Sequence, residues 1–196
     1  MPTFKVPKFG LTKSEKLKQI GRVSQLIFID FDVPWPFAKR ELIMSATAID
    51  DTSNGNIVLA MKTLETGDDE TIPEKAEKSV RVDVDGGFLM RKCPSDHPSL
   101  QFMEGGTNDD LVLVTFSAKL NPNMKYLPQS FLNFLVKTAL GMSWKMMLQL
   151  AQDVKDGKRP DHTKAIEEKD EELYGWVRAR VEEMLGLISE RETLQV

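Results

Sequence analysis

Few residues of this chain could do covalent chemistry. Cys93 follows Arg91 and Lys92 and precedes His97 by four residues, a spacing that would give a thiolate a neighbouring base. The surrounding composition is that of a loop between strands, which favours a structural role for the thiol. With one cysteine and two histidines, the chain has no internal disulfide and no cluster with metal-ligand spacing. We therefore expect no enzyme, no metal and no cofactor.

A second candidate is the acidic segment at 83–87. Asp83 and Asp85, followed by two glycines, resemble the alternating acids of a calcium loop, but the glutamate that such a loop needs further along is missing. The pattern is more typical of a hairpin turn between two strands. Phosphate-binding loops, dinucleotide fingerprints and nucleophile elbows do not occur.

Three charged residues, Arg40, Glu41 and Arg81, lie in or beside apolar segments of strand length. If the arginines faced the interior, they would be buried charges that need a carboxylate, or a phosphate or hydroxyl group of a ligand, as partner. Period-two alternation along a strand would equally well turn them toward solvent. Both alternatives stay open at this point.

The totals narrow the class of protein. The chain of 196 residues is 41% hydrophobic and 29% charged, which predicts one globular domain with an appendage. A net charge of −4 argues against nucleic acid as a partner. Residues 1–22 nevertheless carry six Lys or Arg and one acid, Glu15; this pattern favours a solvated face, and a transient contact with an anionic membrane surface is the alternative. Neither a membrane-spanning run nor a signal peptide is visible, and we expect a cytoplasmic protein.

The order of elements predicts strands first and helices last. A short helix is expected at 12–22, where Thr12 and Glu15 form a capping-box pattern. Strand-length segments bounded by loop residues follow, and short connections favour antiparallel pairing into a twisted sheet of about six strands. These segments are 25–33, 41–50, 57–64, 79–90, 99–104 and 111–120.

Two helices complete the predicted architecture. The first, 127–154, has a narrow polar stripe and an apolar arc too wide to face water, so it must cover either the protein's own sheet or a lipid. The second, an ordinary amphipathic helix within 163–190, could pack on the domain, bind a partner or dimerise, and packing is favoured. We divide the chain into a domain at 1–157 and a helical extension at 158–196.

Three segments together resemble the START (StAR-related lipid-transfer) domain family. They are PWPFAKRE at 34–41, SVRV at 79–82 and NPNMKYLPQSFLNFLVKTAL at 121–140. The family has a Pro-x-Pro turn before an Arg-Asp pair, a Val-Arg pair in a middle strand, and a Leu-Pro before its last helix. Glu41 stands where the family usually has Asp. The resemblance covers about residues 10–155 and lacks the family's N-terminal helix and first strands, so we expect either a shortened form of the domain or a part of a larger one.

The resemblance implies an α+β helix-grip fold, in which a curved antiparallel sheet wraps a long C-terminal helix around a tunnel for one lipid. It implies that Arg40, Glu41 and Arg81 lie in or near this tunnel and that helix 127–154 is its gate. The stripe through Asn133, Lys137 and Lys145 would then face water. The opposite line would face the ligand and contains Phe131, Leu135, Thr138, Met142 and Met146.

The function implied by the resemblance is non-enzymatic binding of one phospholipid or sterol, and transfer of that lipid between membranes is left open. The alternative is a START-like module without lipid that binds a protein partner through residues 163–190. The sequence does not choose the lipid, because selection depends on cavity shape and on the direction of individual side chains.

Overall fold

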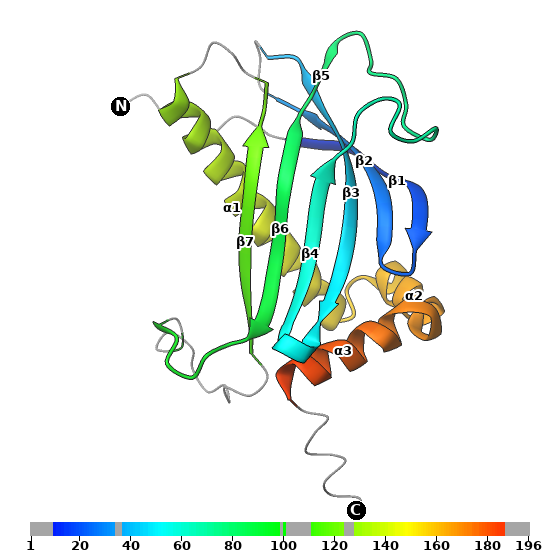
Figure 1. Cartoon of the computed structure of the whole chain (residues 1–196), viewed down its shortest axis with the longest axis vertical. Coiled ribbons are helices and arrows are strands. Elements are labelled where there is room, and N and C mark those ends of the chain that lie inside the picture. The colour runs from blue at the N-terminus through cyan, green and yellow to red at the C-terminus, as the bar shows by residue number, and fades with distance from the viewer. Residues whose placement is uncertain (1–9, 34–36, 99, 101–110, 124–127, 187–196) are drawn as a thin grey trace, which may run out of the picture.

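The computed structural model describes residues 10–33, 37–98, 100, 111–123 and 128–186, which form one curved sheet and a set of helices (Figure 1). The strands are β1 (Gly10–Gly21), β2 (Ser24–Asp32), β3 (Lys39–Asp51), β4 (Asn56–Thr63), β5 (Ser79–Arg81), β6 (Asp83–Lys92) and β7 (Val112–Asn121). The helices are the 3-10 turn η1 (Thr52–Asn54), α1 (Gln129–Lys155), α2 (Pro160–Glu168), the π-helical η4 (Asp170–Tyr174) and α3 (Gly175–Leu185).

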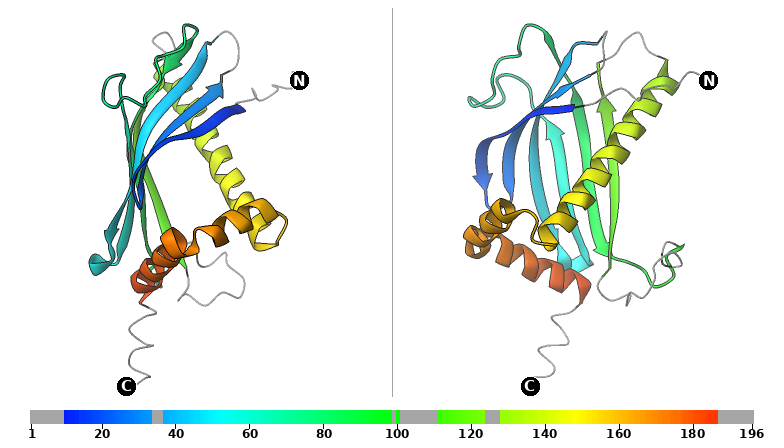
Figure 2. Two further views of the ribbon diagram at one scale, coloured as in Figure 1. Left: turned by 90° about the vertical axis from the view of Figure 1, so that its right-hand side faces the viewer. Right: turned by 180° about the vertical axis from the view of Figure 1, so that it is seen from behind.

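The sheet has the order β1-β2-β3-β4-β6-β7 with antiparallel neighbours, and β5 adds in parallel to the beginning of β3. Figure 2 shows that the sheet is curved, that α1 crosses its concave face diagonally, and that α2 and α3 lie at one end on the same side. The expected α+β helix-grip arrangement is confirmed. The sheet contains seven strands, where the sequence predicted about six.

Buried side chains lie on both faces of the sheet. The most deeply buried large side chains, Leu26 and Ile43, are 1% and 0% exposed, and their alternation along β2 and β3 places them on the convex face. The loop at 64–78 contacts this face at β1 and β3 and contributes the buried Ile72. On the concave face, Ala46 and Val84 are buried as well.

Asp69 fastens this loop to β1. Its carboxylate accepts hydrogen bonds from the Lys18 ammonium at 2.7 Å and from the backbone N–H and the hydroxyl of Thr71. The hydrogen bond from Lys18, followed by those from Thr71, lowers the pKa of Asp69 from 3.8 to about 2. Because the folded-state pKa is depressed, the stabilisation is complete above pH of about 4 and is lost as the pH falls through about 2.

We predict that Asp69→Asn removes this part of the acid sensitivity. Between pH of about 4 and 2, the melting temperature of the wild type should fall more steeply than that of the variant. Circular dichroism melts at closely spaced pH values measure both curves, and Asp96→Asn, in the exposed loop after β6, is the control. Parallel curves for the wild type and Asp69→Asn would contradict the assignment.

The segment at 12–22, predicted as a helix, is the outer strand β1. It pairs with β2 from Gly10 opposite Asp32 to Gly21 opposite Ser24, with three register irregularities. The capping-box pattern reflects only a local preference for helix. Pairing with β2 gives the backbone N–H and C=O groups along the edge of that strand hydrogen-bond partners, and this tertiary interaction overrides the local preference. That prediction was wrong.

The region 79–90, predicted as a single strand, divides into β5 and β6. Two glycines that suggested a hairpin turn, Gly86 and Gly87, lie inside β6. A Cβ on Gly86 would come 2.2 Å from the carbonyl oxygen of Ser117, and one on Gly87 would come 2.1 Å from that of Leu59. Here glycine permits a close approach of β6 to both neighbouring strands, which a side chain would prevent. Most of the strand predicted at 99–104 lies outside the described residues.

Helix α1 ends in a well-formed capping motif. Gly157 takes a left-handed conformation, with φ 71°, and its N–H donates to the carbonyl of Val154, while the N–H of Lys158 donates to the carbonyl of Asp153. The chain then turns into α2. The second predicted helix is interrupted by η4, so that α2 and α3 are separate helices, and α3 buries Met184 and Leu185.

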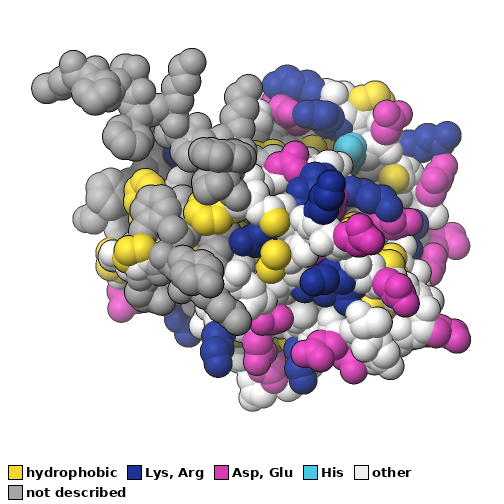
Figure 3. All heavy atoms as spheres, turned by 90° about the horizontal axis from the view of Figure 1, so that it is seen from above, with side chains coloured by type: hydrophobic (Ala, Val, Ile, Leu, Met, Phe, Trp, Pro, Cys, Tyr) yellow, Lys and Arg dark blue, Asp and Glu magenta, His cyan; other side chains and the backbone are white. Residues whose placement is uncertain are grey.

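At the end of the molecule that carries β5 and loop 64–78, the visible described side chains do not form a patch of one charge sign (Figure 3). Lysine and arginine are interspersed with aspartate and glutamate over this surface (Figure 3). A nucleic-acid site needs a continuous basic surface. The visible, described part of this face does not offer one.

Candidate functional site

The concave face of the sheet is an apolar surface that spans four strands. Ladder pairing places Ala48 opposite Leu59, Leu59 opposite Phe88, and Phe88 opposite Phe116, so these side chains share one face. The Phe88 and Phe116 rings are tilted against each other with centroids 4.7 Å apart. The side chains at these positions are half-buried or exposed.

Apolar surface is also exposed on the helix that crosses this face. Along α1, eight large apolar side chains between Phe134 and Leu150 are each 37–67% exposed. They are Phe134, Leu140, Met142, Trp144, Met146, Met147, Leu148 and Leu150. The sheet contributes Val112, Phe116 and Leu120 from β7, which are also exposed. Exposed apolar surface of this extent is typical of a ligand groove or a membrane-contact surface.

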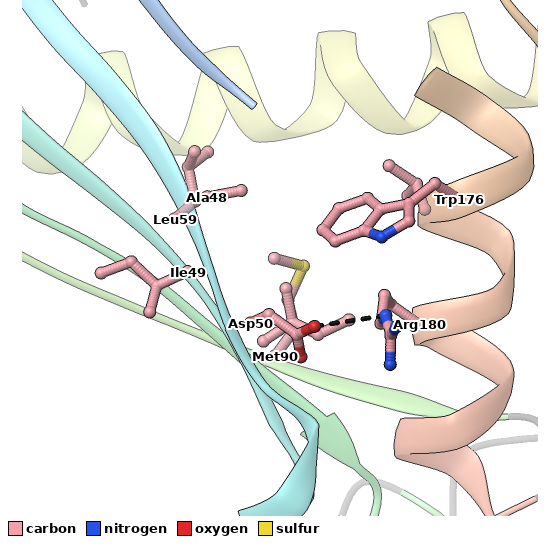
Figure 4. A pocket seen from close by; sticks show the side chains of 9 residues that line it. Ala48, Ile49, Asp50, Leu59, Met90, Trp176 and Arg180 are labelled. Carbon is pink, nitrogen blue, oxygen red and sulfur yellow. Dashed lines mark ion pairs between the residues drawn. The ribbon is translucent and has the colours of Figure 1, made fainter. Parts of the chain in front are cut away.

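At one end of the concave face, α3 closes the space over the sheet. A pocket of about 210 Å³ lies there, with apolar walls. Figure 4 shows the Trp176 indole extending from α3 toward the sheet. The pocket is lined by Ala48, Ile49, Asp50, Ile57, Leu59, Met90, Trp176, Val177 and Arg180.

An ion pair holds α3 in this position. The Arg180 Nε lies 3.2 Å from a carboxylate oxygen of Asp50, the pair marked in Figure 4. The hydroxyl and the backbone N–H of Thr52, and then Arg180, lower the pKa of Asp50 below its ordinary value. The guanidinium groups of Arg22 and Arg180 lie 5.9 and 5.7 Å from the centre of the Trp176 ring, so cation–π contacts reinforce the packing.

Arg40 is buried, with 3% of its surface exposed, and its recorded partners are backbone carbonyl oxygens. Its Nε donates to the carbonyl of Pro122 at 3.1 Å, in the connection between β7 and α1. Burial lowers the pKa of Arg40, yet an arginine remains charged. Arg40 thus links β3 to the connection that follows β7. A role of Arg40 in lipid binding stays a prediction.

The same connection has a further anchor. Asn123, in a left-handed conformation with φ 52°, donates from its side-chain amide to the carbonyl of Arg81 at 2.7 Å. An asparagine tolerates this backbone conformation better than most residues do. At the end of β7, the side-chain amide of Asn121 donates to Asp83 of β6 at 3.2 Å. The segment 122–123 is therefore fixed to β3 and β5, and the end of β7 to β6.

Glu41 and Arg81 are brought together by the parallel pairing of β5 with β3. The Arg81 Nε lies 3.6 Å from a Glu41 carboxylate oxygen. Glu41, 4% exposed, also accepts hydrogen bonds from the Ser79 hydroxyl and the Ala76 N–H, and Arg81 donates to Thr66 at 2.6 Å. Alternation from Arg40 places this pair on the convex side, under loop 64–78. The expectation that Glu41 and Arg81 contact a lipid stays a prediction.

The predicted ligand line along α1 is described only in part. Thr138 is half-buried, Met142 is exposed, and Met146 is 67% exposed. The side chains of Phe131 and Leu135 lie outside the described residues. Asn133, Lys137 and Lys145, predicted to face water, are exposed. Because both lines of the helix are open from residue 140 onward, exposure does not distinguish the ligand side from the solvent side.

The alternative chemical sites receive no support from their surroundings. Cys93 is buried just after β6, with its Sγ 3.7 Å from the Pro94 carbonyl oxygen, as expected for a small apolar core residue. Within the described ranges, no group of three or more His, Cys, Asp or Glu side chains is placed to hold a metal ion. The helices of that same part of the chain lack the combination of length and apolarity required to cross a bilayer.

The pocket under α3 and the loop against the convex side of β1 and β3 were not predicted from the sequence. In the sequence, Trp176 is one apolar position of the amphipathic helix expected within 163–190, and no pattern marks Asp50 or Arg180. Period-two alternation compared across paired strands could have identified Leu59 and Phe88 as one surface. The partner of Trp176 depends on how η4 redirects the chain, for which the sequence has no recognised signal.

The comparison with solved structures agrees with this geometry. The crystal structure of human STARD10 superposes with a TM-score of 0.57 at 13% sequence identity, over 79% of this chain and 55% of that one. The chain thus spans about half the length, 55%, of the STARD10 chain. The lipid transfer and protein localization domain of human StarD13 (DLC2) gives a TM-score of 0.35 at 17% identity, over 43% of this chain and 41% of that one.

No protein-family model matches the chain, and no curated protein matches it. At the identity shared with STARD10, the likeness establishes the fold. The expected resemblance is confirmed at that level, and the chain has the START-like helix-grip fold.

Proposed function

We propose that this protein binds one lipid molecule between the concave face of its sheet and helix α1, without catalysing a reaction. The observation that carries the proposal is the apolar surface on this side of the sheet, where Phe116 and Leu120 of β7 and the large apolar side chains of α1 from Phe134 to Leu150 are exposed. Removing such surface from water stabilises by about 25 cal/mol per Å². A lipid is the class of ligand whose hydrocarbon part is large enough and apolar enough to cover this surface. The START-like fold supports the same conclusion.

Native mass spectrometry of the protein purified from cells tests the proposal. We expect a population heavier than the polypeptide by the mass of one phospholipid or sterol, released on mild denaturation. A protein that carries no lipid, and that also fails to take up fluorescent phospholipid and sterol probes from vesicles, would refute it. Stoichiometry above one would show surface adsorption instead of a single internal site.

We further propose that α1 contacts an anionic membrane surface when lipid enters or leaves. Between residues 129 and 152 the helix has no acid and two lysines, Lys137 and Lys145, in a chain whose net charge is −4. Exposed Trp144 and Leu148 lie among them in sequence. Aromatic and basic side chains together are typical of a helix that lies on a bilayer surface. A cytoplasmic location accords with such a role and stays part of the proposal.

This contact predicts a charge effect. Lys137→Gln combined with Lys145→Gln should weaken binding to vesicles that contain phosphatidylserine by about 30-fold at low salt, since each lysine contributes about 1 kcal/mol. Lys62→Gln with Lys119→Gln removes the same charge from the opposite face of the sheet and is the matched control. Equal losses in the two double variants, measured by vesicle sedimentation, would exclude α1 as the contact.

A protein-interaction module without lipid is less well supported. Its proposed contact, residues 163–190, includes α3, which already buries Met184 and Leu185 and packs Trp176 toward the sheet. An amphipathic helix whose apolar side is occupied has little apolar surface left for a partner. We therefore place the function in the groove.

A further inference from the structure

The helical extension after α1 forms part of the candidate site. Helix α3 lies on the same side of the sheet as α1, at the end of the concave face (Figure 2). The pocket between α3 and the sheet has a volume of about 210 Å³. Sites that enclose a whole drug-sized ligand measure roughly 300–1,000 Å³, while an apolar cavity of about 150 Å³ accepts benzene. The pocket is thus suited to a part of a lipid.

The pocket continues the apolar face. Ala48 and Leu59, which line it, are paired with each other, and Leu59 is paired with Phe88 outside it. An apolar chain lying along the concave face could therefore pass from Phe88 over Leu59 into the pocket without contacting a polar side chain at either residue. Asp50 and Arg180, the charged lining residues, are paired with each other. A charged or phosphate head group would have to compete with that pair, whereas a hydrocarbon end need not.

We infer that this pocket receives the methyl end of a lipid acyl chain, and that Trp176 of α3 sets the greatest chain length the protein accepts. The inference rests on the lipid-binding role proposed above. The ion pair and the cation–π contacts from Arg22 and Arg180 keep the indole in place, so the end of the groove has a fixed wall. A rigid wall discriminates chain length because protein interiors are close-packed and an extra methylene must displace something.

Two substitutions should shift the accepted length in opposite directions. Ala48→Leu fills the pocket, and the added carbons displace roughly two to three methylenes, so the preferred acyl chain becomes shorter by about that number. Trp176→Ala removes the wall, and longer chains should be taken up. Ala60→Leu is the control, because Ala60 lies on the opposite face of β4 from Leu59.

The experiment incubates each full-length protein with vesicles of mixed diacyl phosphatidylcholine, phosphatidylethanolamine and phosphatidylserine with chains of 12 to 20 carbons. Native mass spectrometry then reports the chain lengths of the bound lipid. The expected result is a shorter distribution for Ala48→Leu, a longer one for Trp176→Ala and no change for Ala60→Leu. Circular dichroism establishes that each variant is folded.

The failures of the two proposals are distinguishable. If the wild type and every variant bind lipid with the same distribution, the chain-end pocket is refuted while the lipid-binding role stands. If the wild type takes up none of these lipids, nor the sterol probe, the lipid-binding role falls, and the pocket assignment falls with it. If Trp176→Ala is unfolded, Ala48→Leu against Ala60→Leu still decides the question.

Discussion

Glu41→Ala is expected to destabilise the fold by about 3–5 kcal/mol, since breaking a buried ion pair leaves the other charge uncompensated. The substitution would remove the partner of the Arg81 guanidinium and the acceptor for the Ser79 hydroxyl and the Ala76 N–H at once. These three groups lie at the junction of β3, β5 and loop 64–78. Urea unfolding followed by circular dichroism measures the change in the free energy of unfolding.

Glu74→Ala is the matched control, because Glu74 is an exposed glutamate of the same loop. Its effect should stay within about 0.5 kcal/mol, as for most surface substitutions. Glu41→Gln should be less harmful than Glu41→Ala, since an amide keeps one hydrogen-bond acceptor. A loss below about 1 kcal/mol for Glu41→Ala would show that the cluster is not a structural anchor.

Phe116→Glu is expected to weaken lipid binding by at least about tenfold, which corresponds to about 1.4 kcal/mol. Phe116 lies on the concave face of β7, where a bound lipid would cover a new carboxylate and strip it of water. The effect on folding should be smaller, because the ring is already partly exposed and loses mainly its contact with Phe88, worth about 0.5–1.5 kcal/mol. Titration with a fluorescent phospholipid measures the affinity.

Thr115→Glu introduces the same charge at the neighbouring position of β7, on the opposite face of the sheet. Lipid affinity should be unchanged in this variant. If Thr115→Glu and Phe116→Glu weakened binding equally, the effect would be one of overall charge, and the concave face would not be the binding surface.

The fold could be predicted where local pattern and tertiary contact agree. Strands β2, β3, β4 and β7 have clear boundaries and apolar periodicity, and α1 was placed within two residues of its observed start. The prediction failed at β1 and within β6. At 12–21 a capping pattern favours a helix, yet the open edge of β2 decides the conformation. In β6, Gly86 and Gly87 do not form a turn; they allow close approach of the neighbouring strands β7 and β4.

The candidate site could be predicted only as a class. Glu41 and Arg81 could be singled out from two motifs, but their pairing and the face on which they lie depend on strand register, which a single sequence does not fix. Arg40 could be recognised as a charge beside an apolar strand, whereas its burial depends on a partner, the Pro122 carbonyl, that is 82 residues away along the chain. The pocket under α3 depends on the turn at η4. Interactions between distant segments thus account for what the sequence did not reveal.

The central claim is that a lipid lies between the concave face and α1. Photolabelling tests it most directly, with phosphatidylcholine that carries a diazirine in the middle of one acyl chain and with labelled residues located by tandem mass spectrometry. We predict labels on the concave face, at Leu59, Met61, Phe88 and Phe116, and on α1, with loss of labelling in Phe116→Glu. Labels confined to the convex face, or none above the level of a denatured control, would contradict the account.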